Sequence, residues 1–340
     1  MMRYLNADEL GTRYRAQALD AQQRRILVTN FRGSAQEPDL TEPANCDGFG
    51  RIRHFVRKKS NDWVDNPLPL DPAAKALRVD FGEQLRAQVF QNAVCNWRCW
   101  YCFVPFPLLA ASKTHSRMLT ADELIALWLA EPEHALIIDL TGGQPELVPE
   151  WVLWTMEALK QRKLDRDVYL WSDDNLSADY LWTALSDADR ELIASYRMYG
   201  RVCCFKGFDP ASFTFNTMAP PEEYDRQFER MGKLLRLGVD IYAYVTFTTA
   251  DATDLEGKMS RFIDQLQTLD ENLPLRTVPL KIEVFSPTAS RLNPERSKAL
   301  EIQFRVLELW TASLEKRFSS AQRAARICDV PLSSRTTHGA

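Results

Sequence analysis

The stretch AQVFQNAVCNWRCWYC, residues 87–102, joins a predicted β-strand to three closely spaced cysteines. Residues 87–93 are expected to form the strand, which ends just before Cys95. The cysteines follow as C-x3-C-x2-C, at Cys95, Cys99 and Cys102. Such close spacing lets one loop present three thiolates to one metal centre. The chain has seven cysteines, and an odd number argues against a disulfide framework.

Three thiolates in one loop suit an iron–sulfur cluster better than a structural zinc site. Structural zinc normally takes four protein ligands, commonly as two separated pairs. The remaining cysteines supply no second pair, because two are adjacent and two are isolated: Cys203 and Cys204, Cys46 and Cys328. A [4Fe–4S] cluster also takes four ligands, so three thiolates leave one iron open to a non-protein ligand. We therefore predict a single [4Fe–4S] cluster on Cys95, Cys99 and Cys102, with an incomplete zinc knuckle as the alternative.

A second motif follows a predicted strand at residues 136–140, where the chain continues as TGGQPE, residues 141–146. Together the two motifs resemble those of the radical S-adenosylmethionine (radical SAM) superfamily. That family has C-x3-C-x-φ-C with an aromatic residue at φ, and Gly-Gly-Glu-Pro after the second strand. In this chain a glutamine stands in place of the glutamate. The matching residues are Tyr101, Gly142, Gly143, Gln144 and Pro145.

The resemblance implies a specific chemistry. The reduced cluster would hold S-adenosylmethionine (SAM) and cleave it to a 5′-deoxyadenosyl radical, which abstracts a hydrogen atom from the substrate. Tyr101 would lie against the adenine, and Gly142, Gly143 and Gln144 would hold the amino group. An amide oxygen can accept from an ammonium group, although without the charge assistance of a carboxylate. A one-electron donor such as flavodoxin or ferredoxin is also implied.

From about residue 86, predicted strands alternate with predicted helices, which is typical of a parallel sheet. Strands are expected at 87–93, 136–140, 167–172, 199–205, 239–248 and 277–285. Helices are expected at 120–130, 149–162, 177–195 with a break near Ser186, 221–237, 255–269 and 294–318. These six units match the partial (β/α)6 TIM-like barrel of the family. We therefore expect an α/β fold with an N-terminal extension (1–85), a radical SAM core (86–320) and a C-terminal tail (321–340).

The chemistry of such barrels lies at the carboxyl ends of the strands. The cysteine loop, the Gly-Gly segment, Asp173 and Lys206 all follow predicted strands, so we expect them to meet at one mouth. Asp173 could contact the SAM ribose or the substrate, or simply belong to a solvated turn with Asp174 and Asn175.

Two cysteines lie within the predicted strand 199–205. Because side chains alternate along a strand, Cys204 shares a face with Lys206, and Cys203 takes the other face. Lysine prefers the polar mouth, so Cys204 is our candidate for a thiol that donates a hydrogen atom to a substrate radical. Lys206 is the second candidate catalytic residue. The simpler alternative is that both cysteines are small buried apolar residues.

Composition limits the partners. The 340 residues are 45% hydrophobic and carry a net charge of −4, which disfavours a nucleic-acid binder that relies on phosphate neutralisation. A basic run occupies residues 51–59, with five Lys or Arg side chains. A solvated face is the favoured interpretation of this run, and a site for a small anion is the alternative.

The remaining expectations concern substrate and location. We expect a small-molecule or nucleotide substrate first, a ribosomal peptide second and RNA third. A non-catalytic iron–sulfur or zinc binding protein is the alternative from another class. The first ten residues lack the apolar core of a signal peptide, and no apolar run is long enough to span a membrane, so a cytoplasmic protein is expected. Within the extension, a helix at 7–24 and a strand at 26–31 are predicted.

Overall fold

Seven strands form the main sheet of this protein, whose structure is a computed structural model that describes residues 4–333. The strand order is β10-β9-β8-β7-β6-β4-β3. Six of these strands run parallel, and β3 pairs antiparallel with β4. The strands of this sheet are β3 (Gly50–Val56), β4 (Gln84–Gln91), β6 (Ile137–Thr141), β7 (Tyr169–Asp174), β8 (Tyr199–Phe205), β9 (Ile241–Thr246) and β10 (Thr277–Leu280).

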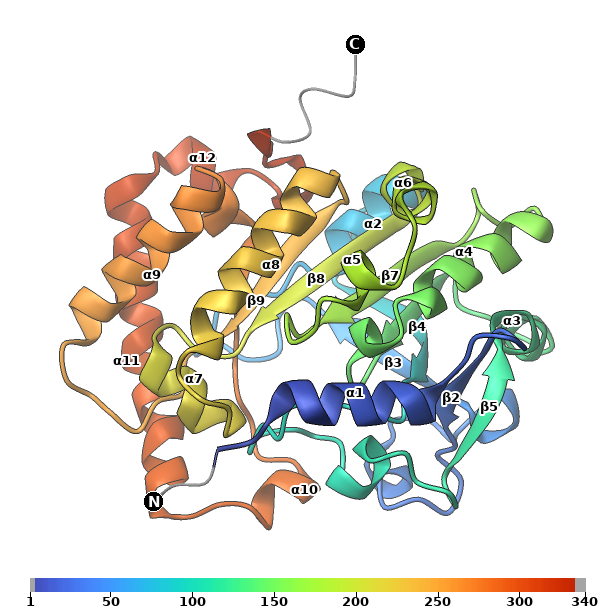
Figure 1. Cartoon of the computed structure of the whole chain (residues 1–340). Coiled ribbons are helices and arrows are strands. Elements are labelled where there is room, and N and C mark those ends of the chain that lie inside the picture. The colour runs from blue at the N-terminus through green and yellow to red at the C-terminus, as the bar shows by residue number, and fades with distance from the viewer. Residues whose placement is uncertain (1–3, 334–340) are drawn as a thin grey trace.

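Helices follow most of the parallel strands and cover the outer face of the sheet (Figure 1). The helices of this core are α3 (Ala121–Leu129), α4 (Glu150–Gln161), α5 (Tyr180–Thr183), α6 (Asp187–Ser195), α7 (Pro210–Thr217), α8 (Glu223–Leu237), α9 (Leu255–Leu269), α10 (Ser286–Ala289) and α11 (Pro294–Arg317). The fold is thus mixed α/β with a curled sheet, as in a partial TIM-like barrel.

Both faces of the parallel strands are buried, so side chains alternate between two cores. On β7, for example, Leu170 packs under the helices, whereas Trp171 faces the inner core. On β8, Cys203 and Phe205 join the outer core, whereas Val202 and Cys204 join the inner one. The inner core ends where polar side chains begin, near the carboxyl ends of the strands.

The N-terminal residues supply further elements around the sheet. α1 (Ala7–Ala18) and α2 (Leu70–Leu77) are helices, and a small antiparallel sheet contains β1 (Leu19–Asp20), β2 (Arg25–Thr29) and β5 (Ser116–Thr120). α12 (Ser320–Ala324) follows α11 near the C-terminus. The three-part division of the chain at residues 85 and 320 stays a prediction, and residues 334–340 of the expected tail lie outside the described part.

The strands and long helices occupy the segments that the sequence predicts, with shifted ends. The predicted helix 7–24 stops at Ala18, because the next residues pair as β1 with β2. The helix predicted at 177–195 is broken as expected: Ser186 caps α6, and the short α5 precedes it. Several elements were not predicted, among them the strands β3 and β5 and the helices α2 and α7. Asp209 is the N-cap of α7. Among residues 4–333 no helix is long and apolar enough to cross a membrane.

Candidate functional site

A cavity of about 240 Å³ lies at the carboxyl ends of the parallel strands. The loops after β4, β6 and β7 and the end of β8 contribute to its wall, so segments far apart in the sequence meet there. The sequence-predicted site residues that line it are Cys95, Cys99, Tyr101, Cys102, Gly142, Gly143, Asp173, Cys204 and Lys206. Gln144 and Pro145 do not line this cavity.

The cysteine loop is held in place by the side chains between its cysteines. The Trp97 indole N–H donates to the Asn175 carbonyl at 3.2 Å, and the Trp100 indole N–H donates to Asn216 Oδ1 at 3.1 Å. Arg98 donates to the Cys95 carbonyl at 2.6 Å. Both tryptophans are almost fully buried. These contacts fix the loop before any ligand binds.

The three cysteines line the same cavity, and none of them forms a disulfide. Burial raises the pKa of Cys95 to about 12 and of Cys102 to about 11, and in both cases repulsion from Cys99 adds to the shift. A thiol with so high a pKa needs a cation or a metal to become a thiolate at neutral pH.

Lys206 supplies one such cation. It is 8% exposed and lines the cavity. Burial alone would lower its pKa, but attraction to negative charge on Cys204, Cys99 and Cys95 raises it above the ordinary value. The ammonium group therefore stays charged beside the cysteine loop, where it stabilises negative charge on the thiols.

Tyr101 extends from the same loop. Its hydroxyl donates to Thr246 Oγ1 at 3.3 Å, and its ring packs edge-on against Trp100 with a centroid distance of 5.6 Å. Burial raises the pKa of this phenol well above its usual value. The side chain is thus a fixed aromatic wall of the cavity.

The Gly-Gly segment is required by the backbone around it. Both glycines adopt positive φ, +77° at Gly142 and +63° at Gly143. A Cβ on Gly143 would lie 2.4 Å from the Val94 carbonyl oxygen and 2.5 Å from that of Asn92. These two residues lead directly into the cysteine loop. Glycine at position 143 therefore lets the two motifs touch.

Gln144 points away from the cavity. Its Nε2 donates to Asp174 Oδ1 at 3.2 Å and to Ser177 Oγ at 3.0 Å, and its Oε1 accepts from the Asn175 amide at 3.0 Å. The side chain is fully buried. In this arrangement Gln144 ties the ends of β6 and β7 together, and its amide is already bonded.

Asp173 lies at the end of β7 and accepts a hydrogen bond from Thr141 Oγ1. Burial raises its pKa above the ordinary aspartate value. Cys204 lines the cavity from β8, whereas Cys203 packs in the outer core. Burial raises the pKa of Cys204 to about 12.

Three charged residues near the cavity were not among the predicted site residues: Asp139, and Arg51 and Arg53 of the basic run, for which a small-anion site was only the alternative. β3 directs Arg51 and Arg53 toward the inner face, so these side chains do not form the solvated face that was favoured for the run. Asp139, on β6, is fully buried, with Arg53 at 3.8 Å. Two signals could have found them: the spacing of two between the arginines, and a lone acid in the apolar segment 136–140.

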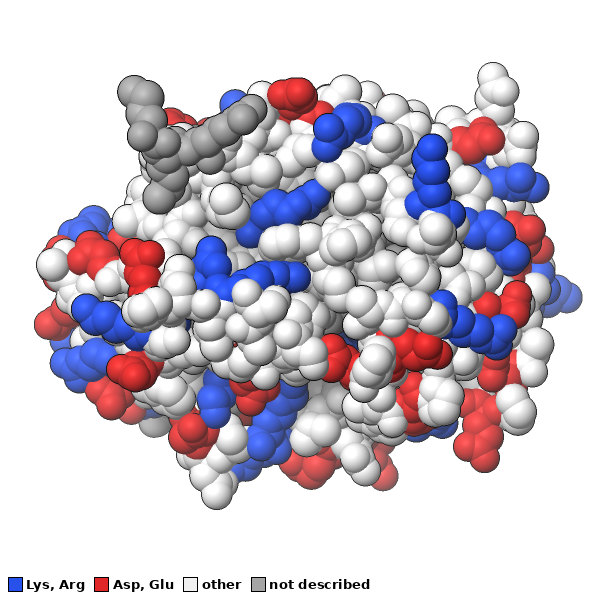
Figure 2. Space-filling model, turned by 90° about the horizontal axis from the view of Figure 1, so that it is seen from below, with Lys and Arg blue, Asp and Glu red and all other residues white. Residues whose placement is uncertain are grey.

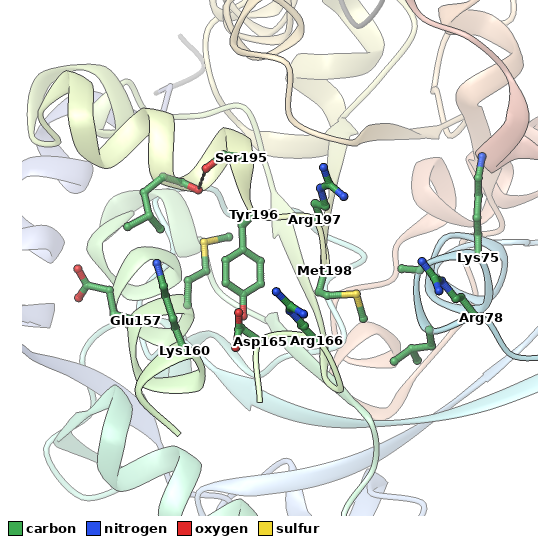
Figure 3. A pocket seen from close by; sticks show the side chains of 14 residues that line it. Lys75, Arg78, Glu157, Lys160, Asp165, Arg166, Ser195, Tyr196, Arg197 and Met198 are labelled. Carbon is green, nitrogen blue, oxygen red and sulfur yellow. Dashed lines mark hydrogen bonds between the residues drawn. The ribbon is translucent and has the colours of Figure 1, made fainter. Parts of the chain in front are cut away.

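A larger cavity, about 850 Å³, lies at the opposite end of the strands (Figure 3). It is bordered by α2, α4 and the loops that precede β7 and β8, with Arg166, Tyr196 and Arg197 among its lining residues. No cysteine and no sequence-predicted site residue lines it. This cavity is the larger of the two, but the cavity that contains the thiols has the side-chain chemistry expected of a functional site.

The residues at the strand ends fit an iron–sulfur cluster in their chemistry. The donor set is three free thiols that line one cavity beside a buried ammonium group. Within residues 4–333 no group of three His, Cys, Asp or Glu side chains is arranged to hold a single metal ion. The ligands of a [4Fe–4S] cluster bind separate iron atoms, so its thiols need not converge on one point.

Comparison with known proteins gives limited similarity. No protein-family model and no curated protein matches the chain. Crystal structures of SuiB from Streptococcus suis align with part of it at 14% identity: bound to precursor peptide SuiA (53% of this chain, TM-score 0.39), without a named ligand (53%, 0.37) and bound to S-adenosylmethionine (52%, 0.37). Each alignment spans 36% of the SuiB chain. The likeness is confined to part of the fold.

Proposed function

We propose that this chain is a radical SAM enzyme whose core is the (β/α)6 unit formed by the six parallel strands and their helices. The observation that carries the proposal is the meeting of the C-x3-C-x2-C loop and the Gly-Gly segment at one cavity. The two motifs are 39 residues apart between Cys102 and Thr141, yet the Val94 carbonyl accepts a hydrogen bond from the Gln144 amide at 2.8 Å.

In this proposal Cys95, Cys99 and Cys102 hold one [4Fe–4S] cluster, and SAM occupies the adjoining space. When bound, the pair supplies a 5′-deoxyadenosyl radical that abstracts a hydrogen atom from a small-molecule or nucleotide substrate. Lys206 provides positive charge beside the thiolates. Tyr101 and the two tryptophans of the loop exclude water from that end of the cavity.

The expected role of Gln144 changes in the light of its contacts. Its amide is bonded to Asp174, Ser177 and Asn175, so we propose that Gln144 positions the turn and that the segment Gly142–Gly143 contacts SAM. Asp173, which lines the cavity on the next strand, is proposed to accept a hydrogen bond from SAM or the substrate. Cys204 is proposed as the thiol nearest the substrate.

The test has two stages on the full chain. Anaerobic reconstitution should give about four iron and four sulfide per chain, and the triple variant Cys95→Ala, Cys99→Ala, Cys102→Ala should lose both. The reduced protein should then convert SAM to 5′-deoxyadenosine. A matched control is Cys328→Ala, since Cys328 is buried near the C-terminus, away from the cavity.

The outcomes separate the alternatives. Bound zinc without iron uptake would favour a zinc-binding protein. A stable cluster without SAM cleavage would favour an iron–sulfur protein without turnover. Formation of 5′-deoxyadenosine that depends on the three cysteines would support the enzyme.

A further inference from the structure

The basic run of residues 51–59 enters the candidate site from β3. This strand forms the edge of the main sheet and pairs with β4, which places Arg51 opposite Val89 and Arg53 opposite Ala87. Arg53 and Lys59 line the cavity, and Arg51 lies deeper, 8% exposed. Three cations of one segment are thus directed toward the space in front of the cysteine loop.

These cations are poorly neutralised by the protein. Among residues 4–333 the Arg51 side chain makes no hydrogen bond or ion pair, and its buried Nε has no partner. Its side chain lies over the Phe103 ring at 5.8 Å. Arg53 lies 3.8 Å from Asp139, which is long for an ion pair, and Asp173 is a second acid nearby. Within the same described part Lys59 has no ion pair.

Other charged side chains of the same run do have hydrogen-bond or ion-pair partners within the protein. Arg57 donates to Asp71 and to the Gly82 carbonyl, and His54 contacts Glu42 at 2.6 Å. The guanidinium of Arg51, by contrast, has no such partner among residues 4–333, and its buried Nε is unpaired. A buried guanidinium without hydrogen bonds is costly, so a ligand that accepts from it would be favoured.

The nearby acids reduce this positive charge only in part. Asp139 is fully buried, and both of its carboxylate oxygens lack a hydrogen-bond partner. Burial and repulsion from Asp173 raise the pKa of Asp139 well above its usual value. Lys59 is affected in the opposite way, since burial and repulsion from Arg53 lower its pKa.

The positive charge is local to the cavity. The face seen from below carries both basic and acidic side chains (Figure 2). Beside the cations the cavity is lined by aromatic rings, including Phe103 and Phe285, whose centroids lie 6.3 Å apart. Both rings are partly exposed, at 36% and 43%. The arrangement suits a small ligand with an anionic group and an apolar body.

We propose that Arg51, Arg53 and Lys59 bind an oxyanion group of the substrate, a carboxylate or a phosphate, while its apolar part lies against Phe103 and Phe285. Guanidinium groups recognise both anions through paired N–H donors. This inference rests on the proposed function, since it names the class of substrate for the same cavity.

The experiment measures anion binding by the full chain in the absence of SAM. Inorganic phosphate and benzoate are titrated separately by calorimetry at low ionic strength against wild type, Arg53→Gln and Lys59→Gln. The matched control is Lys58→Gln, which removes one positive charge from the same run at an exposed position outside the cavity. We expect saturable binding of at least one probe, weakened about tenfold or more in both cavity variants and unchanged in the control.

The two probes distinguish the source of the anion. Binding of phosphate alone indicates a phosphorylated substrate, and binding of benzoate alone indicates an aromatic carboxylate. The proposal is overturned if wild type binds neither probe, or if Lys58→Gln weakens binding as much as Lys59→Gln. It is also overturned if Arg53→Gln weakens SAM more than the probe, since Arg53 would then serve the SAM carboxylate.

Two further controls keep the result interpretable. Arg53→Lys retains the charge and should recover part of the affinity, and thermal melting checks that each variant is folded. If Arg53→Gln does not fold, Lys59→Gln, at an exposed position on the rim, carries the test. The proposed function is judged separately by SAM cleavage in wild type, so either idea can fail alone.

Discussion

The Gln144 side chain donates a hydrogen bond from Nε2 to Asp174 Oδ1 at 3.2 Å, behind the wall of the cavity rather than inside it. The same amide bridges to Ser177 and accepts from the Asn175 backbone. A donor and an acceptor are both needed here, and glutamine supplies them. Asp174 thus gives a structural reason for glutamine at this position, where the motif that the segment resembles has glutamate.

The substitution Gln144→Glu, which introduces the glutamate of the resembled motif, should therefore destabilise the protein. A buried carboxylate would face Asp174, and two donated hydrogen bonds would be lost, at a cost of about 3 kcal/mol at pH 7.5. The loss should shrink as pH falls, because burial raises the pKa of the new carboxyl and the protonated form can donate. Denaturant unfolding at pH 5.5 and 7.5 measures this, with the exposed Gln17→Glu as control. Equal stability of Gln144→Glu and wild type at pH 7.5 would contradict the explanation.

Gly143→Ala should damage both the fold and the cysteine loop. Its Cβ would press on the carbonyl oxygens of Asn92 and Val94, in addition to the strain of a positive φ. Gly33→Ala isolates the strain alone, since Gly33 has φ +68° and no atom within 4 Å of an added Cβ. We expect Gly143→Ala to lose about 2 kcal/mol more than Gly33→Ala. Iron uptake should fall only in Gly143→Ala, and similar losses in both variants would rule out the steric argument.

Glu146 should make stability depend on pH. It lies 2.9 Å from Arg201, and both are buried. Burial raises its pKa from 4.5 to about 7, more than the guanidinium lowers it. The folded state therefore binds the proton more tightly, so this contribution is complete below about pH 4.5 and is lost as pH rises through 7.

The variant Glu146→Gln removes this titration. Relative to the variant, wild type should lose up to about 3 kcal/mol of unfolding free energy between pH 4.5 and 7.5. Unfolding curves at several pH values measure the difference, and the exposed Glu301→Gln should leave the wild-type slope unchanged. Parallel pH profiles for wild type and Glu146→Gln would show that Glu146 keeps an ordinary pKa.

The two adjacent cysteines of β8 should respond differently to alanine. Cys203 is fully buried in the outer core, so Cys203→Ala creates a closed void and should cost about 1 kcal/mol. Cys204 borders an existing cavity, so Cys204→Ala should cost less. If the thiol donates a hydrogen atom, Cys204→Ala should also form 5′-deoxyadenosine while diverting the substrate radical. The order of the two stability losses tests the placement, and normal product yield from Cys204→Ala would exclude the donor role.

Much of the fold follows from the sequence, because buried parallel strands are short apolar runs between amphipathic helices. The strand β3 was not predicted because it is not an apolar run: its charged side chains at positions 51 and 53 point inward beside Asp139. The helix α7 was not predicted either, because its sequence PASFTFNT has little amphipathic periodicity. It nevertheless supplies Asn216, which holds Trp100 in the cysteine loop.

The candidate site was also predictable only in part. Strand order alone brings the cysteine loop, Gly143 and Asp173 to one mouth, so their proximity was predictable. The contacts of Gln144 were not, because its partner Asp174 is 30 residues away and the direction of one side chain is set by packing. The motif predicts where the segment lies, while the local hydrogen bonds decide which of its atoms face the cavity.

The segment between β3 and α2 has a consequence for the edges of the sheet. β3 and β10 are the outermost strands of a sheet that does not close, and this segment runs between them. The Trp63 indole donates to the Pro279 carbonyl at 3.0 Å, Asp62 pairs with Lys281 at 2.8 Å, and Asn66 donates to the Tyr244 hydroxyl at 3.1 Å. The extension therefore acts as the missing side of the barrel. A chain trimmed to begin at residue 86 would lose these contacts and leave that flank of the cavity open to solvent.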